Sequence, residues 1–226
     1  MDFEQRIREL ESELEEKKHQ IADILHRSKN DYAMMSGILG LESTNVDGES
    51  AKILEDCSSR LRILADMNQS LYVEDTDAVY MPPHLYNIAD ARISASAKGH
   101  RINVKYDIDD IYLRPKLATY CGLATNEILT NAIKHAFNED PFSDRNEISI
   151  SLKYTGPENA RFEISDNGCG MKDTEDDGKY HLGKTLIDSF VKSVDGTLTV
   201  RSEPGTGTSY SIEFYLPKDR QLELFE

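Results

Sequence analysis

The sequence is poor in cysteine and has no long apolar run, and both absences narrow the classes of protein to which it can belong. Cys57, Cys121 and Cys169 are far apart, without Cys-x-x-Cys or Cys/His ligand spacing. This argues against a zinc site or a disulfide framework and favours a reducing compartment. No apolar stretch approaches the roughly 20 residues of a membrane-spanning helix, and the N-terminus is charged rather than signal-like. We therefore expect a cytoplasmic chain without direct membrane insertion, with any sensor or membrane segment lying outside it.

Basic residues are also scarce. The 226 residues include 26 Lys and Arg against 41 Asp and Glu, for a net charge of −15. Such an excess of negative charge disfavours nonspecific binding to nucleic acid or anionic lipid, so we expect no nucleic-acid partner. A phosphate site would have to be built locally, from backbone amides, a metal ion and a few lysines.

The first 72 residues show helical periodicity. Residues 3–28 repeat apolar residues at spacings of three and four, interrupted by Lys17, which predicts a coiled coil that needs a partner helix. The simplest source of the partner helix is a second copy of the chain, so we expect a homodimer. The pattern breaks at 43–48 and resumes over 49–72, which predicts an antiparallel hairpin, two of which form a four-helix bundle. The apolar positions of the first segment are Phe3, Ile7, Leu10, Leu14, Ile21 and Ile24.

An acidic, unpatterned stretch at 73–81, followed by Pro82 and Pro83, predicts a domain boundary and a new helix. We therefore divide the chain into residues 1–75, a coiled coil and helical hairpin, and residues 76–226, a second domain. Its mixture of helices and hairpin-linked strands predicts an α+β fold, a mixed sheet with helices on one face. The expected helices are 83–98, 119–137 and 183–194, and the expected strands or extended segments are 101–107, 111–114, 146–154, 160–165, 197–202 and 208–216.

The helix expected at 119–137 carries two stripes. One is apolar and includes Cys121, Ala124 and Ile128, whereas the other is polar. A carboxylate and a carboxamide one turn apart can share a hard cation, and a lysine and a histidine on the next turn can meet anionic oxygens. This pattern favours a magnesium-nucleotide surface, and a simply solvated helix face is the alternative. The polar stripe consists of Glu127, Asn131, Lys134, His135 and Asn138.

A second candidate segment is the strand that ends at Asp166 and continues into Gly168 and Gly170. A carboxylate at a strand end can accept a hydrogen bond from an exocyclic amine, and the glycines let the chain pass close beneath a flat ring. Adenine fits that arrangement. The alternative is an ordinary Asp-Asn-Gly turn.

Several motifs in order resemble those of a known family. Residues 126–137 (NEILTNAIKHAF), 166–171 (DNGCGM), 182–187 (LGKTLI) and 205–208 (GTGT) are similar to the N, G1 and G2 boxes and closing strand of GHKL-type ATPases, in the version found in sensor histidine kinases. Residues 26–30 (HRSKN) resemble the His-Arg-x-x-Asn phosphoacceptor box of the HWE-like class. The resemblance covers nearly the whole chain.

The resemblance implies an ATP-dependent protein-histidine kinase of a two-component system, which phosphorylates His26 and passes the phosphoryl group to an aspartate on a response-regulator receiver domain. Arg27 and Asn30 complete the acceptor box. Glu127 and Asn131 would hold Mg²⁺ and the phosphates, with Glu127 also in the catalytic set. The other residues implied in ATP binding are Lys134 and His135 at the phosphates, Asp166 at the adenine amine, Gly168 and Gly170 beside the ring, Gly183, Lys184 and Thr185 at the start of a helix facing the phosphates, and Thr208 on the closing strand.

The chain departs from the family pattern near His26 and in the G2 box. His26 has no acidic neighbour, so Asp23, Asn30 or Asp31 would have to position its ring. Gly183 alone remains of the usual glycine pair. Residues 178–185 also match the P-loop pattern, but no strand is expected directly before them, and we interpret the match as coincidental.

Two other functions fit parts of the sequence. One is a histidine phosphotransfer protein whose GHKL-like domain is only a scaffold, and the other is a GHKL anti-sigma or serine-kinase module of a partner switch. The combination of Glu127, Asn131 and Asp166 argues against the first, and the hairpin with His26 argues against the second.

Overall fold

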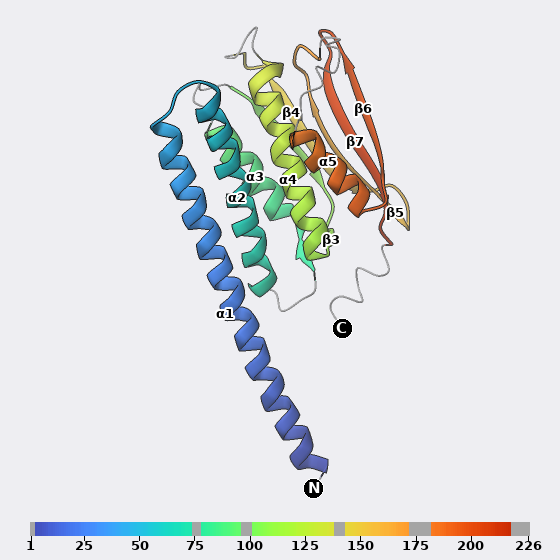
Figure 1. Cartoon of the computed structure of the whole chain (residues 1–226). Helices are drawn as coiled ribbons and strands as arrows, with labels where there is room; N and C mark the ends of the chain where they lie inside the picture. The colour runs from blue at the N-terminus through green and yellow to red at the C-terminus, as the bar shows by residue number, and fades with distance from the viewer. Residues whose placement is uncertain (1–2, 74–77, 96–100, 138–142, 172–181, 218–226) are drawn as a thin grey trace. The chain divides into compact units, whose positions relative to one another are not determined.

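The computed structural model describes residues 3–73, 78–95, 101–137, 143–171 and 182–217, and the chain divides into two compact units, Met1–Asp75 and Thr76–Glu226 (Figure 1). None of the described helices combines the length and apolar character needed to cross a membrane.

The first unit is a helical hairpin of α1 (Phe3–Thr44) and α2 (Glu49–Val73). The 42-residue α1 is much longer than the 25-residue α2, so its N-terminal half extends beyond the hairpin. Gly48, at φ +69°, lies just before α2, and its left-handed backbone suits a residue without a Cβ. The expected hairpin is confirmed.

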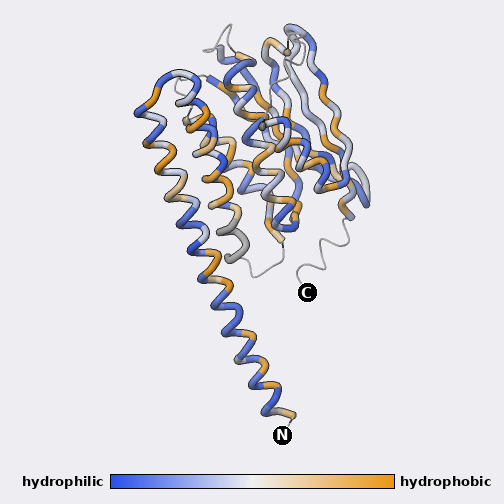
Figure 2. Tube along the Cα trace, in the orientation of Figure 1, coloured by the Kyte–Doolittle hydropathy of each residue, from blue (hydrophilic) through white to orange (hydrophobic). Residues whose placement is uncertain are grey.

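The apolar side chains of the hairpin lie largely on its outside. Where α1 and α2 meet, Ser36 and Ser58 are buried, and each hydroxyl donates to the other residue's carbonyl oxygen at 2.9 Å. Figure 2 shows hydrophobic residues recurring along the whole of α1. The large apolar side chains of α1 that stay exposed are Phe3, Ile7, Leu10, Leu14, Ile21, Ile24, Met34, Met35, Ile38 and Leu41.

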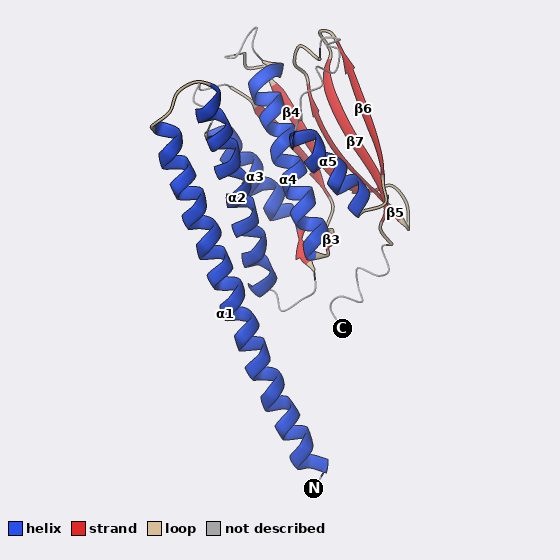
Figure 3. Cartoon of the chain, in the orientation of Figure 1, coloured by secondary structure: helices blue, strands red, loops and turns tan. Residues whose placement is uncertain are grey.

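The second unit is built on a mixed five-stranded sheet in the order β2-β4-β5-β7-β6, with β2 and β4 parallel and the other pairs antiparallel. A two-stranded sheet pairs β1 with β3. The helices lie on one face of the main sheet (Figures 1 and 3), which confirms the expected α+β fold. The strands are β1 (Val79–Tyr80), β2 (Asn103–Ile108), β3 (Tyr112–Leu113), β4 (Glu147–Tyr154), β5 (Asn159–Asp166), β6 (Thr197–Glu203) and β7 (Gly207–Tyr215), and the helices are α3 (Met81–Ser94), α4 (Pro115–Asn131), the π-helix η1 (Ala132–Ala136) and α5 (Leu182–Ser193).

The core of this unit lies between the sheet and the helices. Alternate residues of the central strands are fully buried, because one face of an antiparallel pair packs inward while the other faces solvent. Phe190 of α5 packs between Phe162 and Phe214, with ring centroids 5.7 and 6.2 Å apart in edge-on geometry. This packing holds α5 against the strand that ends at Asp166.

Two local expectations were wrong. The stretch at 73–81 is expected to be unpatterned, yet Val79 and Tyr80 form a strand, because they pair with β3 across a long sequence separation. Helix α4 begins at Pro115, four residues early, and it becomes a π-helix after Asn131. Helix α3 begins at Met81 with prolines in its first turn, where no N–H is needed, which confirms the helix expected to open at Pro82 and Pro83.

Candidate functional site

Asp166 is the last residue of β5 and lies opposite Thr208 of β7. Its Oδ1 accepts hydrogen bonds from the backbone N–H of Gly168 (2.9 Å) and of Thr208 (3.3 Å). Burial raises the pKa of this carboxyl above its ordinary value of 3.8, and the two N–H groups offset only part of that effect. Oδ2 forms no hydrogen bond with any residue in the described ranges. The strand end therefore fixes the carboxylate through Oδ1 and leaves Oδ2 as the oxygen that can accept a further hydrogen bond.

The glycines that follow Asp166 make room for the protein's own backbone. A Cβ on Gly168 would overlap the Cβ and carbonyl oxygen of Ala136, and the N–H of Cys169 donates to that same oxygen at 2.9 Å. Gly170, at φ +70°, would overlap the carbonyl of Glu203. These contacts clamp the turn between η1 and the β6–β7 hairpin. They explain both glycines by packing, and their place beside an adenine ring stays a prediction.

Asn167 anchors the same turn to the start of β4, a role that the sequence analysis missed. Its Oδ1 accepts from the N–H of Glu147 at 2.8 Å, and its Nδ2 donates to the carbonyl of Arg145 at 2.7 Å. An amide side chain in an Asp-Asn-Gly turn is the only sequence signal for it. The two bonds fix the direction in which β5 delivers Asp166.

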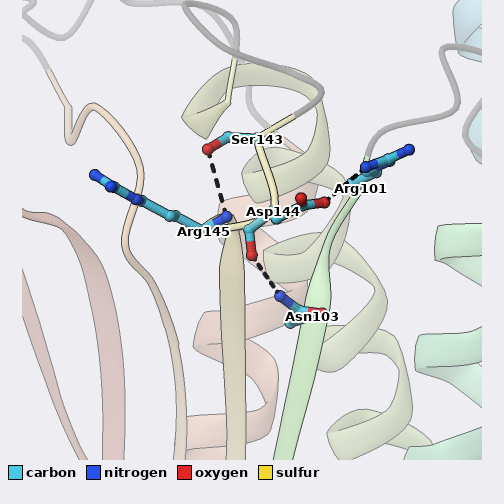
Figure 4. Close-up of polar contacts among 5 residues, drawn as sticks. All are labelled: Arg101, Asn103, Ser143, Asp144 and Arg145. Atoms are coloured by element: carbon cyan, nitrogen blue, oxygen red, sulfur yellow. Dashed lines mark hydrogen bonds and ion pairs between the residues drawn. The ribbon is translucent and has the colours of Figure 1, made fainter.

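The residues before β4 form a polar cluster of their own (Figure 4). Asp144 accepts from Arg101 Nη1 at 2.8 Å through Oδ1, and its carbonyl accepts from Asn103 Nδ2 at 2.8 Å. The N–H of Arg145 lies 3.4 Å from Ser143 Oγ, and the Arg145 side chain points away from Arg101. The cluster ties the starts of the parallel strands β2 and β4 together beside the Asp166 turn.

A third polar contact, between Ser202 and Thr208, supports the closing strand. The two hydroxyl oxygens are 2.9 Å apart, and Ser202 Oγ accepts from the N–H of Met171 at 2.7 Å. Thr208 is buried, as its register with Asp166 requires. Ser202 was not among the predicted site residues. The two-residue alternation along β6 could have indicated that its side chain lies on the same face of the sheet as that of its partner Thr208.

The polar stripe of α4 is not uniformly solvated. Glu127 is only 6% exposed, and its Oε1 lies 3.2 Å from Asn126 Nδ2. Asn131, Lys134 and His135, farther along the same face, are exposed. The solvated-face alternative is therefore wrong for Glu127, because this carboxylate lies between α4 and α5. Asn138, the last member of the stripe, lies outside the described residues.

Helix α5 starts beside Glu127. A Cβ built on Gly183 would lie 2.8 Å from Glu127 Oε2, so the carboxylate rests against the backbone there. Lys184 is exposed and Thr185 is half-buried in the same turn. The glycine- and acid-rich loop and the first residues of the P-loop-like match, 172–181, lie outside the described residues.

The predicted metal ligands Glu127 and Asn131 are one carboxylate and one carboxamide on successive turns of α4. The described residues hold no group of three or more His, Cys, Asp or Glu side chains that could bind a metal ion. Mg²⁺ often binds to one or two protein oxygens and completes its octahedron with water and phosphate, so this sparse donor set fits Mg²⁺ on a nucleotide rather than an all-protein cage.

His26 lies on α1 in the other unit and is exposed. Its Nδ1 is 3.4 Å from Nδ2 of Asn30, one turn later. Arg27 pairs with Asp23 at 2.6 Å. Of the three side chains expected to position the ring, Asn30 is the one beside it, whereas the carboxylate of Asp23 is turned toward Arg27.

Two protein-family models match the chain. The model described as "Histidine kinase" matches residues 23–96, and the model described as "Histidine kinase-, DNA gyrase B-, and HSP90-like ATPase" matches residues 120–220. A curated relative, Blue-light-activated histidine kinase 2 of Erythrobacter litoralis (strain HTCC2594), is 27% identical over 212 residues, which cover 90% of this chain and 59% of that one. The chain thus spans less than two thirds of that relative.

Solved structures share the fold. The histidine kinase domain of the Erythrobacter litoralis EL346 blue-light activated histidine kinase superposes with a TM-score of 0.64 at 22% identity, covering 87% of this chain and 100% of that one. The Acinetobacter baumannii histidine kinase AdeS gives a TM-score of 0.52 at 15% identity, covering 74% and 80%. Both family models match in the expected order, one from within α1 through α3 and the other over most of the sheet domain. The chain therefore carries, in order, matches to the two domains of a histidine kinase core, in an arrangement consistent with the HWE-like class.

Proposed function

We propose that the chain is an ATP-dependent protein-histidine kinase of a two-component system, which transfers the γ-phosphoryl group of ATP to His26 and then to an aspartate on a response-regulator receiver domain. The observation that carries the proposal is Asp166, whose Oδ1 is fixed by two backbone N–H groups while Oδ2 is left to accept from an adenine amine. The two family matches and the exposed His26 support the same function. We place this activity in the cytoplasm.

The nucleotide would lie along η1 and the start of α5. Lys134 and His135 are exposed on η1, at the carboxyl end of α4, where they can meet phosphate oxygens. Lys184 and Thr185 begin α5, where free N–H groups favour an anion. Glu127 and Asn131 would hold Mg²⁺, which neutralises charge on the phosphates. The chain's own contribution to catalysis is then mostly the positioning of ATP.

The acceptor nitrogen of His26 is set by Asn30. The amide faces Nδ1, and when its oxygen is turned to that side it accepts the Nδ1 proton and leaves the lone pair on Nε2. In line attack by Nε2 forms the P–N bond and breaks the bond between the γ-phosphorus and the bridging oxygen, so that ADP leaves. The proton of the ring then passes to solvent. The exposed ring is accessible both to ATP and to a receiver aspartate.

We further propose that the active form is a homodimer through the hairpin and the coiled coil. Met34, Met35, Ile38 and Leu41 are 47–68% exposed, whereas the hairpin interior beside them contains the Ser36–Ser58 pair. A helix whose apolar residues face outward can bury them against another chain. A second copy supplies a matching face and forms a four-helix bundle.

Incubation with γ-labelled ATP and Mg²⁺ tests the proposal. We expect label that is acid-labile and alkali-stable, because a phosphoramidate is hydrolysed in acid, and we expect none in His26→Ala. Acid-stable label would indicate a serine kinase of a partner switch, and no label with native protein would favour a phosphotransfer protein with a scaffold domain. Acid-labile label that survives His26→Ala would refute the acceptor assignment.

A further inference from the structure

The contact between Glu127 and Gly183 joins the two helices that flank the proposed nucleotide site. Glu127 is buried on α4, and Oε2 would lie 2.8 Å from a Cβ at Gly183, a separation that real Cβ atoms essentially never show. The carboxylate thus occupies the space that any other side chain at position 183 would fill.

The backbone of Gly183 does not itself require glycine. The residue lies within α5, and it is not among the described glycines with positive φ, which are Gly48, Gly170, Gly205 and Gly207. In a helix, glycine is less favourable than alanine. Backbone conformation therefore does not explain the glycine at position 183. The atom that a side chain there would meet is Oε2 of Glu127.

We propose that Gly183 is a positioning residue for Glu127: it leaves the space in which the carboxylate is held between α4 and α5, at the place from which it binds the nucleotide's Mg²⁺. The inference rests on the proposed function for the metal. It assigns Gly183 a role that acts through Glu127 rather than through a direct contact with phosphate.

An added methyl group would move the carboxylate rather than the backbone, because Oε2 is the tip of a flexible side chain. Restoring an ordinary contact of 3.4 Å from 2.8 Å requires a shift of about 0.6 Å. Mg²⁺ demands near-ideal octahedral geometry at short distances, so a displacement of that size weakens its binding. Metal-free nucleotide binding does not depend on the carboxylate in this way.

The test compares native protein with Gly183→Ala, Glu127→Ala and the double variant, using calorimetric titration with ATP in the presence and absence of Mg²⁺. We expect Gly183→Ala to reduce affinity for ATP about tenfold with Mg²⁺ and less than about twofold without it. In the Glu127→Ala background, the same change should alter neither affinity by more than about twofold. A loss without Mg²⁺ in both backgrounds would overturn the proposal, since it would mean that position 183 acts on the nucleotide directly. Gly37→Ala is the matched control, because Gly37 is also helical and a Cβ there meets nothing within 4 Å.

Thermal melting separates failure of this inference from failure of the proposed function. If native protein binds no ATP, the function fails, but the contact can still be measured. Gly183→Ala should raise the melting temperature by about 2–4 °C in the Glu127→Ala background, and less in native protein, where the methyl meets the carboxylate. Equal shifts of the melting temperature in both backgrounds would show that Gly183 does not make room for Glu127 and would overturn the proposal. A Gly183→Ala protein that folds only when Glu127 is also replaced would support it, and a double variant that fails to fold would overturn it.

Discussion

Replacement of Asp166 by asparagine removes one acceptor from the proposed adenine site and leaves the fold intact. The side-chain oxygen of asparagine can take the place of Oδ1 and accept from the N–H groups of Gly168 and Thr208, now at 2.9 and 3.3 Å. The second oxygen becomes an NH₂ group, a donor that faces the donor amine of adenine. The substitution therefore keeps the shape of the side chain and turns one hydrogen-bond acceptor into a donor.

The loss of ATP affinity can be estimated from the hydrogen bond that the substitution removes. A hydrogen bond to a charged acceptor contributes about 1.5–3 kcal/mol, and a factor of ten in Kd corresponds to about 1.4 kcal/mol. Asp166→Asn should therefore weaken ATP binding by about tenfold to about a hundredfold. Inosine triphosphate carries an acceptor oxygen where adenine carries the amine, so the variant should bind it better than ATP. Titration calorimetry with both nucleotides measures the two affinities.

The stability of the variant should change in the opposite direction to its affinity. Burial raises the pKa of Asp166, which means that folding makes the ionised carboxylate less stable than it is in the unfolded chain, a cost that is present at neutral pH. The neutral amide avoids this cost while keeping both backbone hydrogen bonds. Its gain in free energy of unfolding should be present above the raised pKa and shrink as the pH falls toward 3.8, where native Asp166 is protonated as well.

Unchanged ATP affinity of Asp166→Asn, or an unchanged preference for ATP over inosine triphosphate, would refute the adenine assignment.

Three further substitutions test the packing, the dimer and the acceptor. Gly168→Ala should lower the free energy of unfolding by about 1–3 kcal/mol in urea titrations, because its methyl overlaps Ala136, whereas Gly156→Ala, with nothing within 4 Å, should not; equal effects would contradict the clamp. Ile38→Glu should convert dimer to monomer in sedimentation experiments while the hairpin keeps its helicity, since Ile38 is 51% exposed within one chain, and a dimer that persists would rule out this face. Asn30→Ala should reduce the rate of labelling of the acceptor histidine about tenfold with ATP affinity unchanged, and an unaltered rate would remove its role as the positioning group.

The sequence predicted those parts of the fold that depend on local periodicity. The hairpin and the central strands followed from apolar spacings of three and four and from two-residue alternation. The strand β1 was missed because its partner, β3, is about 30 residues away and two-residue strands have no periodicity of their own. The same limit applies to η1, since residues 132–136 continue a helical pattern whichever helix type they adopt.

The site residues show a similar division. Motif order was enough to single out Asp166 and Glu127, but the reasons for the neighbouring glycines lie in contacts between distant segments. Gly168 accommodates Ala136, and Gly183 accommodates Glu127. Neither contact could be read from spacing, because both depend on how closely two elements approach in space. Asn167 was likewise hidden, since a turn asparagine has the same appearance in sequence whether or not it holds a neighbouring strand.

These contacts suggest how an acidic chain can build a site for a polyanion. With a net charge of −15, long-range attraction for ATP is unfavourable, so recognition must come from groups at short range. The exposed Lys134 and Lys184 supply local positive charge, while the carboxylate of Glu127 is withdrawn from solvent between α4 and α5. In the proposed site, burial of Glu127 would keep its charge away from the phosphates until a divalent cation accompanies them. Mg²⁺ would then bridge the carboxylate and the nucleotide, and the space left by Gly183 would keep the carboxylate within reach of the metal.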